Sequence, residues 1–134
     1  MMYLTVEEKE DRLRDLQKEI AAGLIDKELI EAIIKFNAIK GVCTTYSCSS
    51  HRENDRPYVS FRFSFPFEFL WDYIVDLTHR FDVTLKIVGD ELPMYCFVLN
   101  QRSRIIDFLE KLESILLRAS LDYFDKTIPE DRMG

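Results

Sequence analysis

The nine residues from Thr44 to Arg52 bring together side chains that could do chemistry. They contain five Ser or Thr hydroxyls, the thiol of Cys48, the imidazole of His51 and the guanidinium of Arg52. Ser and Thr hydroxyls bond to the local backbone and shape turns, and they also donate hydrogen bonds to a carboxylate, a phosphate or a nucleobase edge. The pattern is therefore typical either of a polar strand end or of a ligand-binding site.

A metal site is one alternative use of these residues. Cys43, Cys48 and His51 follow the spacing C-x4-C-x2-H, and Cys96 or His79 would supply the fourth ligand that structural zinc requires. Structural zinc sites usually have tighter paired spacing, so we assign no metal from this pattern.

A nucleophilic thiol is another alternative. Cys48 and His51 would form a thiolate–imidazolium pair, with Arg52 favouring the thiolate. The residues around Cys48 do not form the motif of a known cysteine hydrolase. For Cys43 and Cys96 we expect the ordinary role of a small buried side chain.

Hydrophobic periodicity places this segment at the end of a strand that follows two helices. Thr5 to Glu8 form a capping-box pattern, and apolar residues then recur at helical spacing as far as Leu24. A second helix is expected from Asp26 to Gly41. The same two periodicities predict the later elements: strands at 42–47, 58–65, 83–87 and 94–99, a helix behind Pro66, and a last helix capped by Asn100 or Ser103.

Strict alternation predicts which side chains of the first strand share a face. Residues Val42, Thr44 and Tyr46 are expected on one face, and Cys43, Thr45 and Ser47 on the other. The loop that follows, Cys48 to Arg56, is long, polar and free of glycine. A long polar loop in a compact domain is often functional.

The order of elements predicts the fold class α+β. Two N-terminal helices are followed by a duplicated ββα-ββα body, in which a four-stranded sheet has its helices packed mainly on one face, as in a rearranged ferredoxin-like sheet. The length of 134 residues suits a single domain. Its expected parts are a helical hairpin at 1–41, the body at 42–124 and a polar tail at 125–134.

Charge is unevenly distributed along the chain. The net charge of −6 divides into −4 for residues 1–31, +3 for residues 32–65 and −5 for residues 66–134. The overall acidity argues against a surface that is basic throughout, and any anionic partner is expected at the loop-bearing third. With an odd number of cysteines and no secretory signal or membrane span in the sequence, we expect a cytoplasmic protein that contacts no membrane.

The residues Thr44-Thr45-Tyr46-Ser47-Cys48-Ser49 resemble a signature of the wybutosine-synthesis tRNA methyltransferase family that acts at the third step of that pathway. In that family an apolar helix ending in Asn, here Phe36-Asn37, precedes a strand with the pattern T-T-S-S-C-S-G-R. Tyr46 replaces a Ser, Ser50 the Gly and His51 the Arg, with Arg52 one place later. The chain equally resembles related short proteins with the pattern T-x-Y-S-C-x-G-H, which have no established activity. The match covers about residues 28–65.

The resemblance implies a methyl transfer from S-adenosylmethionine to a guanosine derivative of tRNA. The candidate catalytic residues are then Ser47, Cys48 and His51, and the candidate ligand-binding residues are Thr44, Thr45, Tyr46, Ser49, Arg52, Arg56 and Tyr58.

Three hypotheses follow for the function. The chain is a relative of the family that binds a small anionic or nucleotide-like ligand at the Ser47–Arg52 loop, or it is a true methyltransferase, or it is a non-enzymatic protein. The last would pair as a homodimer through a seam on the first helix, formed by Leu13, Leu16, Ile20 and Leu24.

Overall fold

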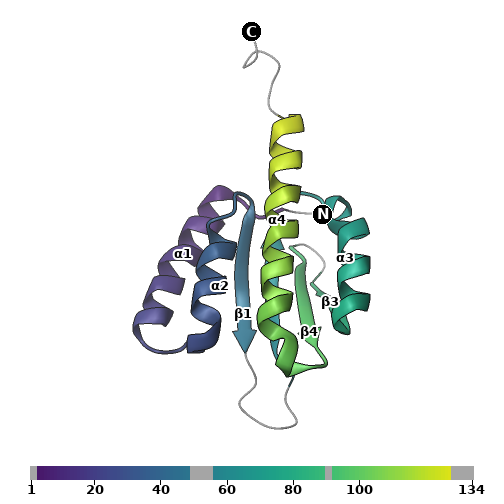
Figure 1. The fold of residues 1–134 in the computed structure, drawn as a ribbon. Coiled ribbons are helices and arrows are strands. Elements are labelled where there is room, and N and C mark those ends of the chain that lie inside the picture. Colours follow the sequence, from purple (N-terminus) through teal and green to yellow (C-terminus); the bar gives the residue numbers. More distant parts are fainter. Residues whose placement is uncertain (1–2, 49–55, 90–91, 128–134) are drawn as a thin grey trace.

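The computed structural model describes residues 3–48, 56–89 and 92–127, without the side chains of Cys48, Arg102, Lys126 and Thr127. The fold is α+β, and the predicted order of two helices followed by two strand-strand-helix units is confirmed (Figure 1). The elements are α1 (Val6–Ala21), α2 (Lys27–Asn37), β1 (Val42–Cys48), β2 (Tyr58–Phe63), α3 (Glu68–Phe81), β3 (Val83–Val88), β4 (Met94–Leu99), a 3-10 turn η1 (Arg102–Arg104) and α4 (Ile105–Thr127).

The four strands form one antiparallel sheet in the order β1-β2-β4-β3. The two hairpins are therefore joined through β2 and β4, which are the central strands, while β1 and β3 form the edges. Because β1 and β2 are antiparallel neighbours, β1 ends and β2 begins at the same end of the sheet, where Cys48 pairs with Tyr58 (Figure 1).

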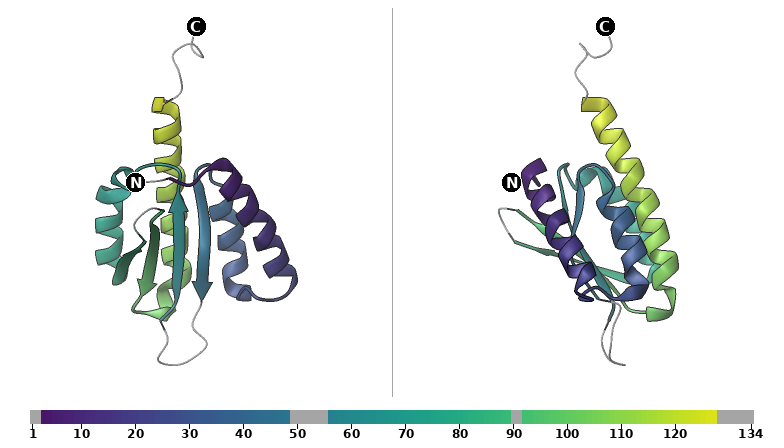
Figure 2. Two further views of the ribbon diagram at one scale, coloured as in Figure 1. Left: turned by 180° about the vertical axis from the view of Figure 1, so that it is seen from behind. Right: turned by 90° about the vertical axis from the view of Figure 1, so that its left-hand side faces the viewer.

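Helices α2, α3 and α4 cover one face of the sheet (Figures 1 and 2). The side chains that alternate inward from β2 and β4 are Val59, Phe61, Phe63, Tyr95, Phe97 and Leu99, and all are buried. Phe61 meets Phe36 of α2 edge to face, with ring centroids 4.9 Å apart. Aromatic pairs of this geometry stabilise a core beyond the area that they bury.

Helix α1 lies beside the β1 edge rather than in the layer formed by the other helices (Figure 2). Its capping box is confirmed: the Thr5 hydroxyl accepts from the Glu8 amide, and Glu8 Oε1 accepts from the Thr5 amide, both at 3.1 Å. An exposed edge strand invites pairing with other chains, and covering it with a helix prevents this. Helix α1 performs that role for β1.

Several predicted boundaries shift. Strand β1 continues to Cys48, β2 ends at Phe63 and not at Phe65, β3 continues to Val88, and α2 ends at Asn37, before Gly41. Helix α3 begins at Glu68 and not directly behind Pro66, and α4 continues to Thr127, three residues into the predicted polar tail. Helix ends are the least certain part of any prediction from periodicity.

Candidate functional site

A bulge in β1 decides where the polar residues of this strand point. Thr44 pairs with Phe61 and Ser47 pairs with Val59, so β1 spends one more residue than β2 between these two pairs. Thr44 and Ser47 therefore share the face that packs on the helices. The predicted alternation, which placed Ser47 with Cys43 and Thr45, is wrong beyond Thr44, because an extra residue reverses the side of every residue after it.

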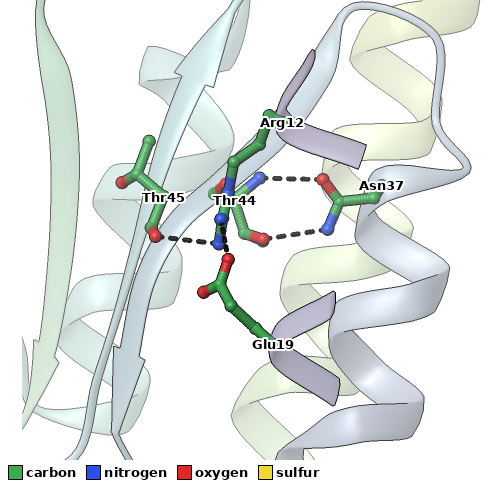
Figure 3. A network of polar contacts seen from close by, with 5 residues as sticks. All are labelled: Arg12, Glu19, Asn37, Thr44 and Thr45. Carbon is green, nitrogen blue, oxygen red and sulfur yellow. Dashed lines mark hydrogen bonds and ion pairs between the residues drawn. The ribbon is translucent and has the colours of Figure 1, made fainter. Parts of the chain in front are cut away.

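Thr44 is locked to the end of α2 (Figure 3). Asn37 Nδ2 donates to Thr44 Oγ1 at 2.8 Å, and the Thr44 amide donates to Asn37 Oδ1 at 3.0 Å. Asn37 Nδ2 also donates to the Ile33 carbonyl at 2.8 Å. Thr44 is only 1% exposed. A ligand would reach its hydroxyl only by breaking a buried, satisfied network, so Thr44 is left out of the site proposed below.

Arg12 of α1 holds the backbone of β1 where the bulge begins. Its Nε donates to the Thr44 carbonyl at 2.7 Å, and one terminal nitrogen donates to the Thr45 carbonyl at 3.0 Å. The other terminal nitrogen forms an ion pair with Glu19 of the same helix (Figure 3). The Glu19 carboxylate orients the guanidinium, and the guanidinium in turn satisfies two carbonyls of the sheet edge.

Ser47 lines a small space on the helix side. Its neighbours there are apolar side chains of α2, β2 and α4, with the start of β2 at Tyr58 and Val59. The volume open to the centre of a water molecule is about 10 Å³, which is roughly the minimum for a single water. The space around Ser47 therefore does not fit S-adenosylmethionine or any other organic ligand.

The other predicted residues lie toward the loop end of the sheet. Tyr46 is 64% exposed, Arg56 is exposed, and Cys48 pairs in register with Tyr58. Tyr58 is half-buried. Ser49, His51 and Arg52 lie outside the described residues, as does the side chain of Cys48.

The sheet face away from α2, α3 and α4 carries the only charged residues of the four strands, Arg62 and Lys86. Arg62 pairs across the strands with Cys43. Burial raises the pKa of the Cys43 thiol, although Arg12, Arg62 and Lys9 each favour the thiolate. Three cations and the Glu8 carboxylate, which opposes the thiolate, therefore lie near this one buried position. Alternation in the sequence 58–63 indicated that Arg62 faces away from the core, but not that α1 would bring two more cations to it.

The predicted seam of α1 faces α2 within the same chain. Leu16 is buried, and Leu13 and Ile20 line an apolar groove with Ile34 and Ala38 of α2. Leu24 lies beyond the helix and is 72% exposed.

No metal-binding group and no membrane span are found in the part of the chain that the structure describes. Among these residues, no cluster of three or more His, Cys, Asp or Glu could hold a metal ion. Cys43 and Cys96 are free thiols, on strands separated by β2. None of the described helices is long and apolar enough to cross a membrane.

Comparison with known proteins finds a similar fold but indicates no activity. No protein-family model matches the chain, and no curated protein matches it. Among solved structures it is similar to the PH1069 protein from Pyrococcus horikoshii, with 13% sequence identity and a TM-score of 0.53, over 87% of this chain and 94% of that chain. At this identity the similarity shows a shared fold alone, and the relation to the tRNA methyltransferase family stays a prediction.

Proposed function

We propose that the chain binds a small anionic, nucleotide-like ligand at the end of the sheet where β1 and β2 enter their connecting loop. The observations that carry this proposal are the exposed Tyr46 on the loop-end half of β1 and the exposed Arg56 just before β2. Tyr46 lies two residues before Cys48, on the sheet side of the Cys48–Tyr58 pair, and Arg56 lies two residues before Tyr58, on the loop side. Because the strands are antiparallel, the two residues are about 14 Å apart along the strand direction and would contact different parts of one ligand. An exposed ring offers a base a surface on which to stack, and a guanidinium pairs with phosphate or carboxylate.

The local charge supports the same choice of ligand. Residues 32–65 carry a net charge of +3, whereas the segments on either side are acidic. None of the four described strands contains an Asp or Glu. The positive potential of this basic region would attract an anion, and the acidic rest of the molecule would repel it.

The family resemblance supports S-adenosylmethionine as one ligand to test and tRNA as a partner to test. In that finer hypothesis Ser47, Cys48 and His51 would contribute to a methyl transfer. Ser47 points toward the helices and its surroundings are too small for the cofactor. A bound S-adenosylmethionine would therefore occupy the outer side of the loop end, next to Tyr46 and Cys48.

Calorimetric titration of the full chain with AMP, S-adenosylmethionine and inorganic phosphate tests the proposal. We expect saturable binding of AMP, and about tenfold weaker binding in Tyr46→Ala and in Arg56→Gln, because each removes one of the two contacts. Tyr73→Ala and Arg14→Gln are matched controls, since both side chains are exposed on helices far from the loop end in the sequence. Their affinities should equal that of the unmodified chain.

The results separate the hypotheses. If none of the three compounds binds, or if the control variants weaken AMP as much as Tyr46→Ala does, the proposed site is wrong. If S-adenosylmethionine binds and its labelled methyl group appears on tRNA, the methyltransferase hypothesis is correct. Loss of that transfer in Cys48→Ser, with cofactor binding unchanged, would assign a role to the thiol.

A further inference from the structure

Strand β3 is an edge of the sheet and leaves two large apolar side chains exposed. Within the sheet formed by the described residues, it pairs with β4 alone. Ile87 is 58% exposed and Val88 is 52% exposed. The other edge strand, β1, has two of its carbonyls bonded to Arg12 of α1. An edge strand with exposed apolar residues is a template on which another strand can pair.

The apolar surface of β3 continues onto α3, which lies beside this strand (Figure 1). Ile87 pairs across the strands with Tyr95, and Phe67 stacks on the Tyr95 ring with the centroids 4.4 Å apart. Trp71 contacts Phe67 edge to face, with 6.0 Å between the centroids. Trp71 and Val75, one helical turn apart, are both exposed. Two packed rings therefore join the exposed side of α3 to the exposed end of β3.

The order of residues in β3 suits antiparallel pairing with a second copy of the same strand about a twofold axis. Because Ile87 and Trp71 both lie on the helix side of the sheet, the two copies bring them together only if residues of like face are paired. An axis at Leu85 places Val83 opposite Ile87 of the partner subunit, which is an apolar pair. It also places Thr84 opposite Lys86 of the partner subunit. An axis at Lys86 would instead oppose two lysines, which is destabilising.

Strand pairing alone is a small interface, and α3 supplies further area. The six residues of β3 span about 20 Å, whereas stable interfaces bury about 800 Å² on each partner. A twofold axis beside β3 brings the exposed Trp71 and Val75 of α3 toward the same surface of the second copy. Tryptophan is enriched in the residues that contribute most to binding. The chain carries a net charge of −6, but β3 contains no carboxylate, so the two strands do not add to the repulsion between copies.

We propose that the chain forms a symmetric homodimer through β3, with the two copies of this strand antiparallel about an axis at Leu85 and the two copies of α3 side by side. The dimer joins two four-stranded sheets into one continuous sheet. The loop-end site proposed above involves β1 and the start of β2, and β3 is the opposite edge. The dimer therefore leaves that site accessible and does not depend on it.

Sedimentation equilibrium of the full chain tests the proposal. We expect a monomer–dimer equilibrium at micromolar concentrations. Ile87→Lys should raise the dissociation constant of the dimer by about tenfold or more, because it buries a charge opposite an apolar side chain. Ile34→Lys is the matched control, since Ile34 is an isoleucine exposed to a similar degree on α2. Its dissociation constant should equal that of the unmodified chain.

Substitution of Thr84 tests the position of the axis. Thr84→Glu would create two symmetry-related pairs with Lys86 of the partner subunit, and Thr84→Lys would create two like-charge pairs. We expect the first variant to tighten the dimer and the second to weaken it, each by about two- to tenfold. Equal effects of the two variants would overturn the axis at Leu85.

Hydrogen exchange of the unmodified chain examines the interface without any substitution. The amides of β3 that point away from β4 should exchange more slowly as the protein concentration rises, and those of β1 should not change. This measurement decides the matter if a variant does not fold.

Three results would overturn the proposal: a chain that stays monomeric throughout the micromolar range, a dimer that Ile34→Lys weakens as much as Ile87→Lys does, and exchange in β3 that is independent of concentration. Tyr46→Ala should leave the dimer unchanged, so failure of the loop-end site and failure of the dimer are distinguishable.

Discussion

At the scale of single residues, burial decides the chemistry of the cysteines. Cys43 is 2% exposed, and burial raises the pKa of its thiol. The thiolate is the reactive form, so both the access of a reagent and the thiolate fraction are low at neutral pH. Cys96 is partly exposed on β4.

We therefore expect iodoacetamide to modify Cys96 of the native protein much faster than Cys43. Peptide mass spectrometry after timed labelling measures both rates in one experiment. A higher pH should accelerate Cys43, because more of the thiol ionises. In denaturant the two rates should become equal, which is the internal control. Equal rates in the native protein would contradict the burial of Cys43.

The Asn37–Thr44 pair is the second residue-scale feature, and it concerns stability. Asn37→Ala leaves the Thr44 amide and hydroxyl buried without partners, which typically costs about 1–3 kcal/mol per group. We expect urea denaturation to show a loss of about 2–4 kcal/mol for Asn37→Ala. Asn100→Ala, which removes exposed bonds to Asp82, should cost far less. The double variant with Thr44→Val should lose less than the sum of the two single variants, because the residues interact directly. Strict additivity would contradict the pairing.

At the scale of elements, α1 protects the β1 edge through Arg12. The Arg12 guanidinium donates two hydrogen bonds to carbonyls of this edge strand. Each such bond from a charged group contributes about 1.5–3 kcal/mol to the free energy of unfolding, and the cost of partly burying the guanidinium offsets some of this stabilisation. The two bonds also occupy acceptors that another strand would otherwise use.

We expect Arg12→Ala to lower the free energy of unfolding by about 1–3 kcal/mol. Hydrogen exchange should become faster at the amides of β1 and unchanged in β3, the opposite edge. The exposed edge should also increase self-association, which sedimentation measures. Arg14→Ala, on the same helix but paired only with Asp11 at the surface, should do neither. An Arg12→Ala protein with unchanged exchange in β1 would show that α1 does not hold the strand.

The elements also show how far the sequence predicts this molecule. The capping box of α1 and the alternating Phe61 and Phe63 of β2 are local signals, and both were correctly predicted from them. The bulge in β1 was not predicted, and the contacts made where it begins come from other elements: Arg12 is 32 residues from Thr44, and Asn37 is seven. Since a bulge reverses the faces of the residues that follow, missing it placed Ser47 on the wrong side. The cations around Cys43 were missed for the same reason, since α1 brings two of them from a distant part of the chain.

At the scale of the whole molecule, the balance of charge limits which partners the chain binds tightly. The protein is acidic overall, with a net charge of −6, and the only charged residues of its four strands are the cations Arg62 and Lys86. A phosphate backbone is bound by releasing counterions, about one for each phosphate that a cation neutralises. Arg62, Lys86 and Arg56, with Arg52 of the loop, supply about four such contacts.

If tRNA is a partner, its affinity should therefore depend only moderately on salt. We expect a plot of the logarithm of the binding constant against the logarithm of the KCl concentration to have a slope no steeper than about −4. Fluorescence anisotropy of a labelled tRNA measures this slope. Arg62→Gln should make it shallower by about one, and Arg14→Gln should not change it. A much steeper slope would mean that RNA uses a basic surface other than these residues, and an unchanged slope in Arg62→Gln would mean that the RNA backbone does not reach the sheet face.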